Sequence, residues 1–377
     1  MPPAPAPTPF RSMRLFGRPK QTVGLDIGSG LVKAVVLDHA GGAPELVRAV
    51  VTPLADDAIV EGDVMDPALV VDAVRTTIAA AGSGKAAVAV AVGGRDVIVK
   101  RIRAPRARGA EARALLRWEA EQHVPFDMSS VALDFHVLDP EGSEAEMGVL
   151  IAAAKRELVD ARIALLADAG VAPAVVDVDA FALHNAYIVS TPPSAAEAGD
   201  GLVALAHVGN ETTIVNVLDG NVPVLTRDLA LGTRRLREDL QRELGLSAPA
   251  ADALLRGERP SPALAALVGR YAEDLAAEVE RATAVLSSGS DDAGPLRALF
   301  LGGGGARVPG LAAATAARLR VRVESLNPLA GIAVADGALD GIDAEAVAPL
   351  LLLAIGLGVR RPVGRAARTA AAARAAA

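Results

Sequence analysis

The stretch GLDIGSGLVKA, residues 24–34, decides the fold that this sequence predicts. It lies within residues 22–38, where two apolar segments flank the turn Gly28-Ser29-Gly30, a pattern typical of two strands joined by a tight turn. Glycines at such a turn let backbone N–H groups come close to phosphate oxygens. Asp26 is placed to hold a hydrated Mg²⁺, and Lys33 to reach a phosphate as a point charge.

Taken alone, this stretch has a second interpretation of equal weight, an ordinary hairpin with a charged surface lysine. It is neither a Walker loop nor a Rossmann fingerprint, because no helix directly follows Gly30. The rest of the chain therefore has to decide between a phosphate site and a plain turn.

A second strand–turn–strand segment repeats the first without a gap. His207-Val-Gly209 aligns with Asp26-Ile-Gly28, and Asp219 then aligns with Asp38. This internal repeat predicts two related halves. The alternation of strands and helices in both halves predicts α/β lobes. The second turn offers the amides of Gly209 and Asn210 and the hydroxyls of Thr212 and Thr213 to a terminal phosphate, although a plain hairpin also explains it.

Four consecutive glycines, residues 302–305, follow an apolar strand predicted at residues 296–301. They remove every Cβ where a base or ribose could lie against the backbone. Because such a run lowers stability when it has no role, it favours close approach of a ligand over a flexible turn.

Composition excludes several classes of protein. Cysteine is absent, which excludes a disulfide framework, a thiolate metal site and a cysteine nucleophile and fits a cytoplasmic protein. The formal charge of -7 argues against nucleic-acid binding. No apolar run reaches the length of a membrane span, and residues 346–359, interrupted by Pro349, are predicted to form a buried helix. The four histidines at 39, 123, 136 and 184 lack metal-ligand spacing and are interpreted as structural.

In this order and with helical segments between them, the three glycine elements resemble the phosphate-1, phosphate-2 and adenosine motifs of the actin, Hsp70 and sugar-kinase superfamily. The resemblance implies a two-lobed actin-like (ribonuclease H-like) ATPase fold that binds ATP and Mg²⁺, the metal through Asp26. It assigns to the nucleotide Asp26, Gly28, Ser29, Gly30, Lys33, Gly209, Asn210, Thr212, Asp252, Arg256, Gly302, Gly303, Gly304 and Arg307.

Further segments resemble the PilM family of type IV pilus assembly proteins over residues 22–361. They are ALLRWEAEQHVPFD (114–127), VLIAAAKRELVD (149–160), VVDVDAFALHNAY (175–187), LGTRRLREDLQRELGLSAPAADALL (231–255), NPLAGIAV (327–334) and APLLLLAIGLGVRRP (348–362). PilM proteins bind ATP and use the small subdomain 1C, shared with the division protein FtsA, to capture the cytoplasmic N-terminal peptide of the inner-membrane protein PilN. The resemblance thus implies a protein at the cytoplasmic face of the inner membrane, held there through pilus partners, and a possible homo-oligomer.

The resemblance also implies a division of the chain. Residues 1–20 form a disordered basic tail, with weak membrane-surface contact as an alternative role. Residues 21–83, 171–190 and 342–361 form subdomain 1A, and residues 84–170 form the FtsA-type insertion 1C. After a linker at residues 191–201, residues 201–230 and 295–341 form subdomain 2A and residues 231–294 form 2B. Residues 362–377 form a disordered Ala/Arg tail.

One departure from the superfamily affects catalysis. His207 stands where most members carry an aspartate, and an imidazole is a poor partner for Mg²⁺, which prefers oxygen. Asp179 lies where the chaperones carry the carboxylate that orients the attacking water; a helix N-cap is an equally good interpretation. With Asp179 and Asp26 as the catalytic candidates, binding of ATP is better supported than rapid hydrolysis.

Two further pairs keep alternative interpretations. Asp252 and Arg256 lie where relatives touch the ribose and base, but an intrahelical i,i+4 ion pair explains them too. Trp118 and Phe126 flank the presumed peptide-binding insertion, either as core residues or as peptide contacts.

Other classes of function remain as alternatives to the scaffold. A filament-forming membrane anchor like FtsA needs a bulky amphipathic C-terminal helix, and residues 365–377 hold only Ala, Arg and Thr. A small-molecule kinase needs an aspartate base near a substrate pocket, for which the sequence gives no candidate.

Overall fold

The predicted hairpin at the start of the chain forms β1 (Gln21–Ile27) and β2 (Leu31–Asp38) in the computed structural model. The structure describes residues 20–82, 84, 86–190, 201–289 and 294–361, so most of the predicted tails and linker lie outside the described residues. β1 and β2 are antiparallel, with Asp26 opposite Lys33 and Gln21 opposite Asp38. Five consecutive residues of β1 are buried because the sheet is covered on both faces.

The first sheet has the order β10-β6-β1-β2-β3-β16. β6 and β10 run parallel to β1, whereas β2 and β3 complete an antiparallel meander. The structure places these strands at β3 (Glu45–Pro53), β6 (Ala87–Val92), β10 (Pro173–Val178) and β16 (Ala333–Val334). A separate two-stranded ribbon, β4 (Ile59–Val60) and β5 (Asp63–Val64), follows β3.

Helices cover both faces of this sheet. α1 (Pro67–Ala81), which Asp66 caps, and α3 (Arg156–Asp168) pack on one face. α4 (Asp179–Ser190) and α11 (Leu352–Gly358) pack on the other. The buried helix predicted at residues 346–359 is divided into α10 (Ala344–Val347), a 3-10 turn (Ala348–Leu351) containing Pro349, and α11. In the described residues, no helix is both long and apolar enough to cross a membrane.

The second lobe repeats the first, as the internal repeat in the sequence predicts. Its strands have the order β15-β14-β11-β12-β13, which matches β10-β6-β1-β2-β3 strand for strand. The register matches as well, since Leu202 lies opposite Asp219 as Gln21 lies opposite Asp38. The strands are β11 (Leu202–Val208), β12 (Thr213–Asp219), β13 (Val222–Leu229), β14 (Leu296–Gly302) and β15 (Arg322–Ser325).

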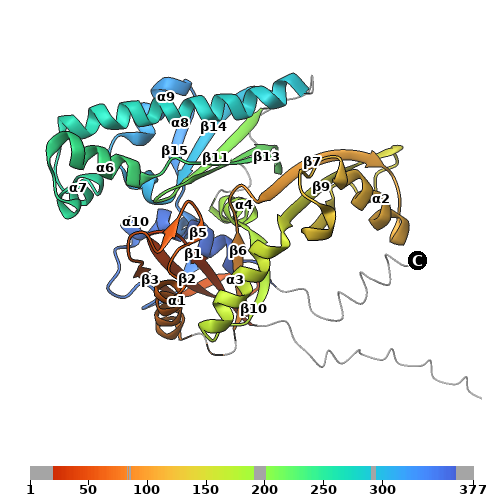
Figure 1. Ribbon diagram of the computed structural model, residues 1–377, viewed down its shortest axis with the longest axis horizontal. Coiled ribbons are helices and arrows are strands. Elements are labelled where there is room, and N and C mark those ends of the chain that lie inside the picture. The colour runs from red at the N-terminus through yellow and green to blue at the C-terminus, as the bar shows by residue number, and fades with distance from the viewer. Residues whose placement is uncertain (1–19, 83, 85, 191–200, 290–293, 362–377) are drawn as a thin grey trace, which may run out of the picture.

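In the part of the chain that the structure describes, four helices complete the second lobe, and the long helix α8 crosses the top of the molecule in Figure 1. The helices are α6 (Thr233–Leu244), α7 (Ala248–Leu255), α8 (Pro262–Gly289) and α9 (Leu311–Leu319), with 3-10 turns at Gly304–Arg307 and Pro328–Gly331. The two-lobed α/β arrangement is the actin-like ATPase fold that the sequence predicts.

An insertion projects from the lobes at the right of Figure 1. It consists of β7 (Val97–Pro105), α2 (Gly109–Glu121), a 3-10 turn (Met128–Ser130), β8 (Val131–Val137) and β9 (Glu146–Lys155). β7 pairs with β13 through Lys100 and Leu225, so the second sheet continues through the insertion as β13-β7-β9-β8.

The boundaries expected for this insertion, residues 84–170, are too wide. β6 lies inside the first sheet, between β1 and β10, whereas β7 belongs to the second sheet. α3 packs into the core of the first lobe through Leu165 and Leu166. The residues that leave the first lobe are therefore 97–155, and an FtsA-type identity for them stays a prediction.

Candidate functional site

A cavity of about 510 Å³ lies between the two lobes, where the two glycine turns face each other. The turns have the same geometry: Gly28 N donates to Leu31 O at 3.1 Å, and Gly209 N donates to Thr212 O at 2.9 Å. Asn210 Nδ2 donates to Ser29 Oγ at 3.4 Å and joins the two turns across the cavity.

The cavity brings together almost every residue that the sequence assigned to a nucleotide. Its lining includes Asp26, Gly28, Ser29, Gly30, Lys33, Asp179, Gly209, Asn210, Thr212, Asp252, Arg256, Gly303, Gly304 and Arg307. Gly302 is the exception: it is the last residue of β14, and a Cβ there would lie 2.1 Å from Leu352 Cδ1. Three elements that are distant in the sequence thus converge on one cavity.

Packing within the protein explains most of the four-glycine run. Gly303 has a φ of 75°, and a Cβ on it would lie 2.4 Å from the carbonyl oxygen of Val208. A Cβ on Gly305 would lie 2.2 Å from Val208 Cγ1. Of the four, only Gly304 would accept a Cβ without a clash, since the nearest atom, Thr233 Oγ1, would be 3.9 Å away. The close approach of the Gly303–Gly305 turn to β11 therefore accounts for glycines that the sequence analysis attributed to a ligand.

A buried ion pair lies at the floor of the cavity. Lys33 Nζ is 2.6 Å from Asp26 Oδ2, and each side chain is less than a tenth exposed. The pair follows from the strand register, which places the two residues opposite each other on β1 and β2. Lys33 thus fixes the position of the Asp26 carboxylate. The described residues contain no group of three or more acidic or histidine side chains arranged to hold a metal. Mg²⁺ commonly takes one or two carboxylates and fills its other positions with water and phosphate, so a single Asp26 fits this pattern.

Asp179 and His207 flank the same floor, and burial changes the pKa of both. Burial, and then the Asp26 carboxylate, raise the pKa of Asp179 to about 7. Burial lowers the pKa of His207 to about 4, so its imidazole is neutral at pH 7. His207 Nδ1 has no hydrogen-bond partner among the described residues, which leaves a polar atom available for a ligand or water. Asp179 begins α4, and a Cβ on Gly93 would lie 2.0 Å from Asp179 Oδ2, so the carboxylate lies against the glycine turn after β6.

Substituting Asp179 with asparagine should stabilise the protein more at pH 8 than at pH 5. Between its ordinary value of 3.8 and about 7, the carboxyl keeps its proton only in the folded state, so its contribution to stability falls as the pH rises through this window. Asparagine is neutral at both values. The change in melting temperature between Asp179→Asn and wild type should therefore increase with pH, whereas an equal difference at both values would contradict the burial of this carboxyl. The opposite pH dependence of His207 is common to both proteins and cancels in the comparison.

The pair Asp252 and Arg256 does not form the intrahelical ion pair that was one interpretation of the sequence. Arg256 Nε lies 2.8 Å from Glu258 Oε1, and Asp252 Oδ2 lies 4.0 Å from Arg237 Nη1. Both residues line the cavity. Their alternative role beside the ribose and base stays a prediction.

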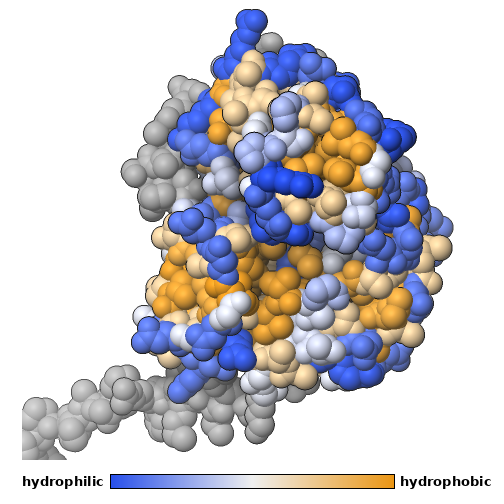
Figure 2. Space-filling model, turned by 90° about the vertical axis from the view of Figure 1, so that its left-hand side faces the viewer, coloured by the Kyte–Doolittle hydropathy of each residue, from blue (hydrophilic) through white to orange (hydrophobic). Residues whose placement is uncertain are grey.

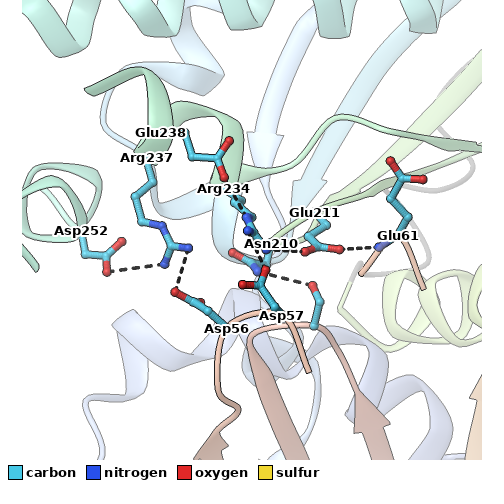
Figure 3. Close-up of polar contacts among 10 residues, drawn as sticks. Asp56, Asp57, Glu61, Asn210, Glu211, Arg234, Arg237, Glu238 and Asp252 are labelled. Atoms are coloured by element: carbon cyan, nitrogen blue, oxygen red, sulfur yellow. Dashed lines mark hydrogen bonds and ion pairs between the residues drawn. The ribbon is translucent and has the colours of Figure 1, made fainter. Parts of the chain in front are cut away.

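A network of charged residues joins the two lobes beside the cavity (Figure 3). Arg234 of α6 contacts Asp57 at 2.7 Å, Glu211 at 2.9 Å and Glu238 at 2.8 Å. Arg237, one turn further along, reaches Asp56 at 3.2 Å. On the face that carries α7, hydrophilic residues run across the middle of the molecule (Figure 2).

The loop that meets α6 holds an uncommon backbone conformation. Asp57 and Glu61 have φ values of 63° and 49°, a region that residues other than glycine rarely adopt. Glu61 N donates to Glu211 Oε2 of the other lobe at 2.5 Å. The two residues with this strained backbone, Asp57 and Glu61, are thus also residues that contact the second lobe. These contacts could not be predicted from the sequence, because they join residues that are distant in the chain.

A second cavity, of about 790 Å³, lies between the insertion and the first lobe, and Asn221, Val222 and Pro223 of the second lobe also line it. We refer to it as the groove. β8 forms one wall and, among the described residues, has a neighbouring strand, β9, on one side only, because it ends the eight-stranded sheet. The groove is lined by apolar side chains of β8, α3, β10 and α4, among them Leu133, Phe135, Val159, Val176 and Phe181, and by polar groups that include Asp134, His184, Asn185 and Arg360.

The aromatic pair expected at a peptide site lies elsewhere. Trp118 of α2 does not line the groove, and it is 59% exposed on the surface of the insertion. Phe126 packs against the core of the insertion, with Lys155 Nζ 5.3 Å from its ring centre. Its exposure shows that Trp118 is not a core residue, and a contact between Trp118 and a peptide stays a prediction. The aromatic residues that line the groove are Phe135 and Phe181.

Comparison with known proteins gives one family. The family model described as type IV pilus assembly protein PilM matches residues 24–362. A solved structure described as a PilM-PilN type IV pilus biogenesis complex has a TM-score of 0.77 and 27% sequence identity, covering 91% of this chain and 99% of that one. The ethanolamine utilization protein EutJ from Carboxydothermus hydrogenoformans has a TM-score of 0.53 and 16% identity over 90% of each chain, a likeness that shows the fold alone.

Proposed function

Because the chain belongs to the type IV pilus assembly protein PilM family, we propose that it is an ATP-binding scaffold of pilus assembly that binds the N-terminal segment of PilN. The observation that carries this proposal is the presence of two cavities of different chemistry. One is walled by glycine turns and charged side chains, the other by a free sheet edge and apolar side chains. The first suits a nucleotide and the second suits a peptide.

The nucleotide in the interlobe cavity is ATP with Mg²⁺. The amides of the two glycine turns approach its phosphates from both lobes, and Lys33 and Asp26 lie beneath them. Asp252, Arg256 and Arg307 lie where the ribose and base extend. A ligand that contacts both lobes favours the closed arrangement already made by Arg234 and Arg237.

Replacing Asp26 with alanine should weaken the binding of Mg-ATP at least tenfold, about 1.4 kcal/mol. The variant loses the carboxylate that holds the hydrated metal and leaves Lys33 buried without its partner. Calorimetry on wild type and Asp26→Ala measures the effect, and a melting curve of each protein shows whether the variant is folded. Unchanged affinity in a folded variant would sink the assignment of Asp26.

Hydrolysis of ATP by this site is slow. His207 occupies the position where most of the superfamily carries an aspartate, and its neutral imidazole is a poor partner for Mg²⁺. Asp179 remains the group placed to orient a water, but its pKa of about 7 leaves it partly protonated near neutral pH. Phosphate release is measured on the purified wild-type protein used for the Mg-ATP calorimetry. Release many times per second would contradict slow hydrolysis.

The peptide occupies the groove between the insertion and the first lobe. An extended segment can add to the free edge of β8 by backbone hydrogen bonds, while its apolar side chains meet Phe135 and Phe181. The relative whose structure contains PilN supports the choice of partner. Through this inner-membrane partner the protein is held at the cytoplasmic face of the membrane, in agreement with the role that the sequence implies. The expectation of a filament anchor or a small-molecule kinase receives no support from these two cavities.

A further inference from the structure

Arg162 enters the nucleotide cavity from α3, outside the three glycine elements that the sequence identified. Its side chain lines the cavity together with Asp26, Asp179 and His207. Among the described residues it makes no hydrogen bond or ion pair, although Asp179 and Asp26 lie near enough to favour its charge. Burial acts in the opposite direction and lowers its pKa. A guanidinium that lines this cavity without a fixed partner offers a planar fork of donors that suits phosphate oxygens.

The other cations of the cavity are differently placed. Three are held by carboxylates: Lys33 by Asp26, Arg237 by Asp56, and Arg256 by Glu258. Arg307 follows the glycine run, at the end of the cavity assigned to the base. Arg162 is thus the cation that the described residues leave uncommitted beside Asp26 and Asp179, where a terminal phosphate would lie.

α3 also forms part of the wall between the nucleotide cavity and the groove. Leu158 and Arg162 line the cavity, whereas Val159 lines the groove. The start of α4, directly after β10, also lies between the two cavities, since Asp179 lines the nucleotide cavity and Phe181 lines the groove.

The same helix is joined directly to the insertion. α3 begins at Arg156, the residue after the end of β9, and β9 pairs with β8, the wall of the groove. Lys155 at this junction lies 2.9 Å from Asp96. A displacement of α3 by a ligand at Arg162 therefore reaches the groove through contiguous covalent structure and packed side chains.

We propose that Arg162 binds the terminal phosphate of ATP and that α3 transmits this contact to the groove, so that peptide affinity depends on the γ-phosphate. The inference rests on the proposed nucleotide and peptide sites and adds a residue and a regulatory link that those sites do not require. ADP lacks the phosphate that Arg162 contacts, so it leaves α3 without this contact. Only a ligand with a different interaction in the two states shifts the equilibrium.

The first test compares nucleotides on the full-length protein by calorimetry. Arg162→Ala should lower the affinity for Mg-ATP about tenfold and change the affinity for Mg-ADP less than twofold, with Arg162→Lys between the two. Arg95→Ala is the matched control, because Arg95 is exposed and outside the cavity. An equal loss for both nucleotides, or no loss, in a folded variant would overturn the role of Arg162. Melting curves establish folding, and Arg162→Gln serves if alanine unfolds the chain.

The second test measures a synthetic peptide of the PilN N-terminal segment in the presence of each nucleotide. Wild type should bind the peptide with affinities that differ about fivefold or more between ATP and ADP, and Arg162→Ala should show no difference. Equal peptide affinity in wild type with both nucleotides would overturn the coupling. If the wild type binds neither nucleotide, the proposed function is overturned as well. If the wild type binds ATP but Arg162→Ala leaves the ratio of ATP affinity to ADP affinity unchanged, this inference alone is overturned.

Discussion

Replacing Gly24 by alanine is expected to lower the free energy of unfolding by about 3 kcal/mol or more, because no space exists for its Cβ. The Cβ would lie 1.8 Å from the carbonyl oxygen of Ala354 in α11. Gly356, in α11 itself, has the same constraint, since its Cβ would lie 1.8 Å from the carbonyl oxygen of Ala182 in α4. The clashing atoms are backbone, so no change of rotamer relieves them, and the layers β1, α11 and α4 would have to separate.

The expected loss is measured as a melting temperature lower by roughly 5–10 °C for Gly24→Ala and for Gly356→Ala. Gly269→Ala is the matched control. Gly269 lies in α8, and a Cβ there would meet nothing within 4 Å. Alanine is expected to be neutral or slightly stabilising at this helical position. A variant of Gly24 that melts with wild type would contradict the close packing of α11 beneath the strand that carries Asp26.

The second large effect is expected in the groove. Phe181→Ala should weaken binding of the PilN peptide by about 2 kcal/mol, roughly thirtyfold, because truncating a central aromatic contact removes buried area and packing. Phe181 lies in α4 and lines the groove beside β8. Fluorescence anisotropy with a labelled peptide and full-length protein measures the change.

Trp118→Ala is the control for this experiment, because Trp118 is larger than Phe181 but lies outside the groove. Its substitution should change peptide affinity less than twofold. Circular dichroism melts of both variants separate loss of binding from loss of structure. If Trp118→Ala abolishes binding while Phe181→Ala retains it, the peptide contacts the exposed face of α2 and the groove assignment is wrong.

The parts of the fold that the sequence predicted depend on local pattern. The hairpins β1–β2 and β11–β12 follow from apolar runs around glycine turns, and their matching registers follow from the gapless alignment of Asp26 with His207. Asp66 followed by Pro67 is a typical start of a helix, and α1 begins there. Most of the residues that line the interlobe cavity could be predicted to lie together, because they belong to three short contiguous stretches of sequence.

The remainder depends on contacts between distant segments, which single-sequence patterns do not contain. β6 and β7 are neighbours in the chain, yet one joins the first sheet and the other continues the second. Tryptophan is a residue type that is common at binding sites, but in the fold Trp118 lies exposed on the surface of α2. Arg162 occupies an ordinary helical position in the sequence, and only the packing of α3 beside the cavity brings it to Asp26 and Asp179.

The most direct test of the account is a crystal structure of the full-length protein with Mg-ATP and a synthetic peptide of the PilN N-terminal segment. The account predicts density for the phosphates between the turns at Gly28 and Gly209, with the base beside Arg256. It also predicts an extended peptide along β8 that contacts Phe181. A nucleotide bound outside the interlobe cavity, or a peptide bound at a surface other than the groove, would contradict it.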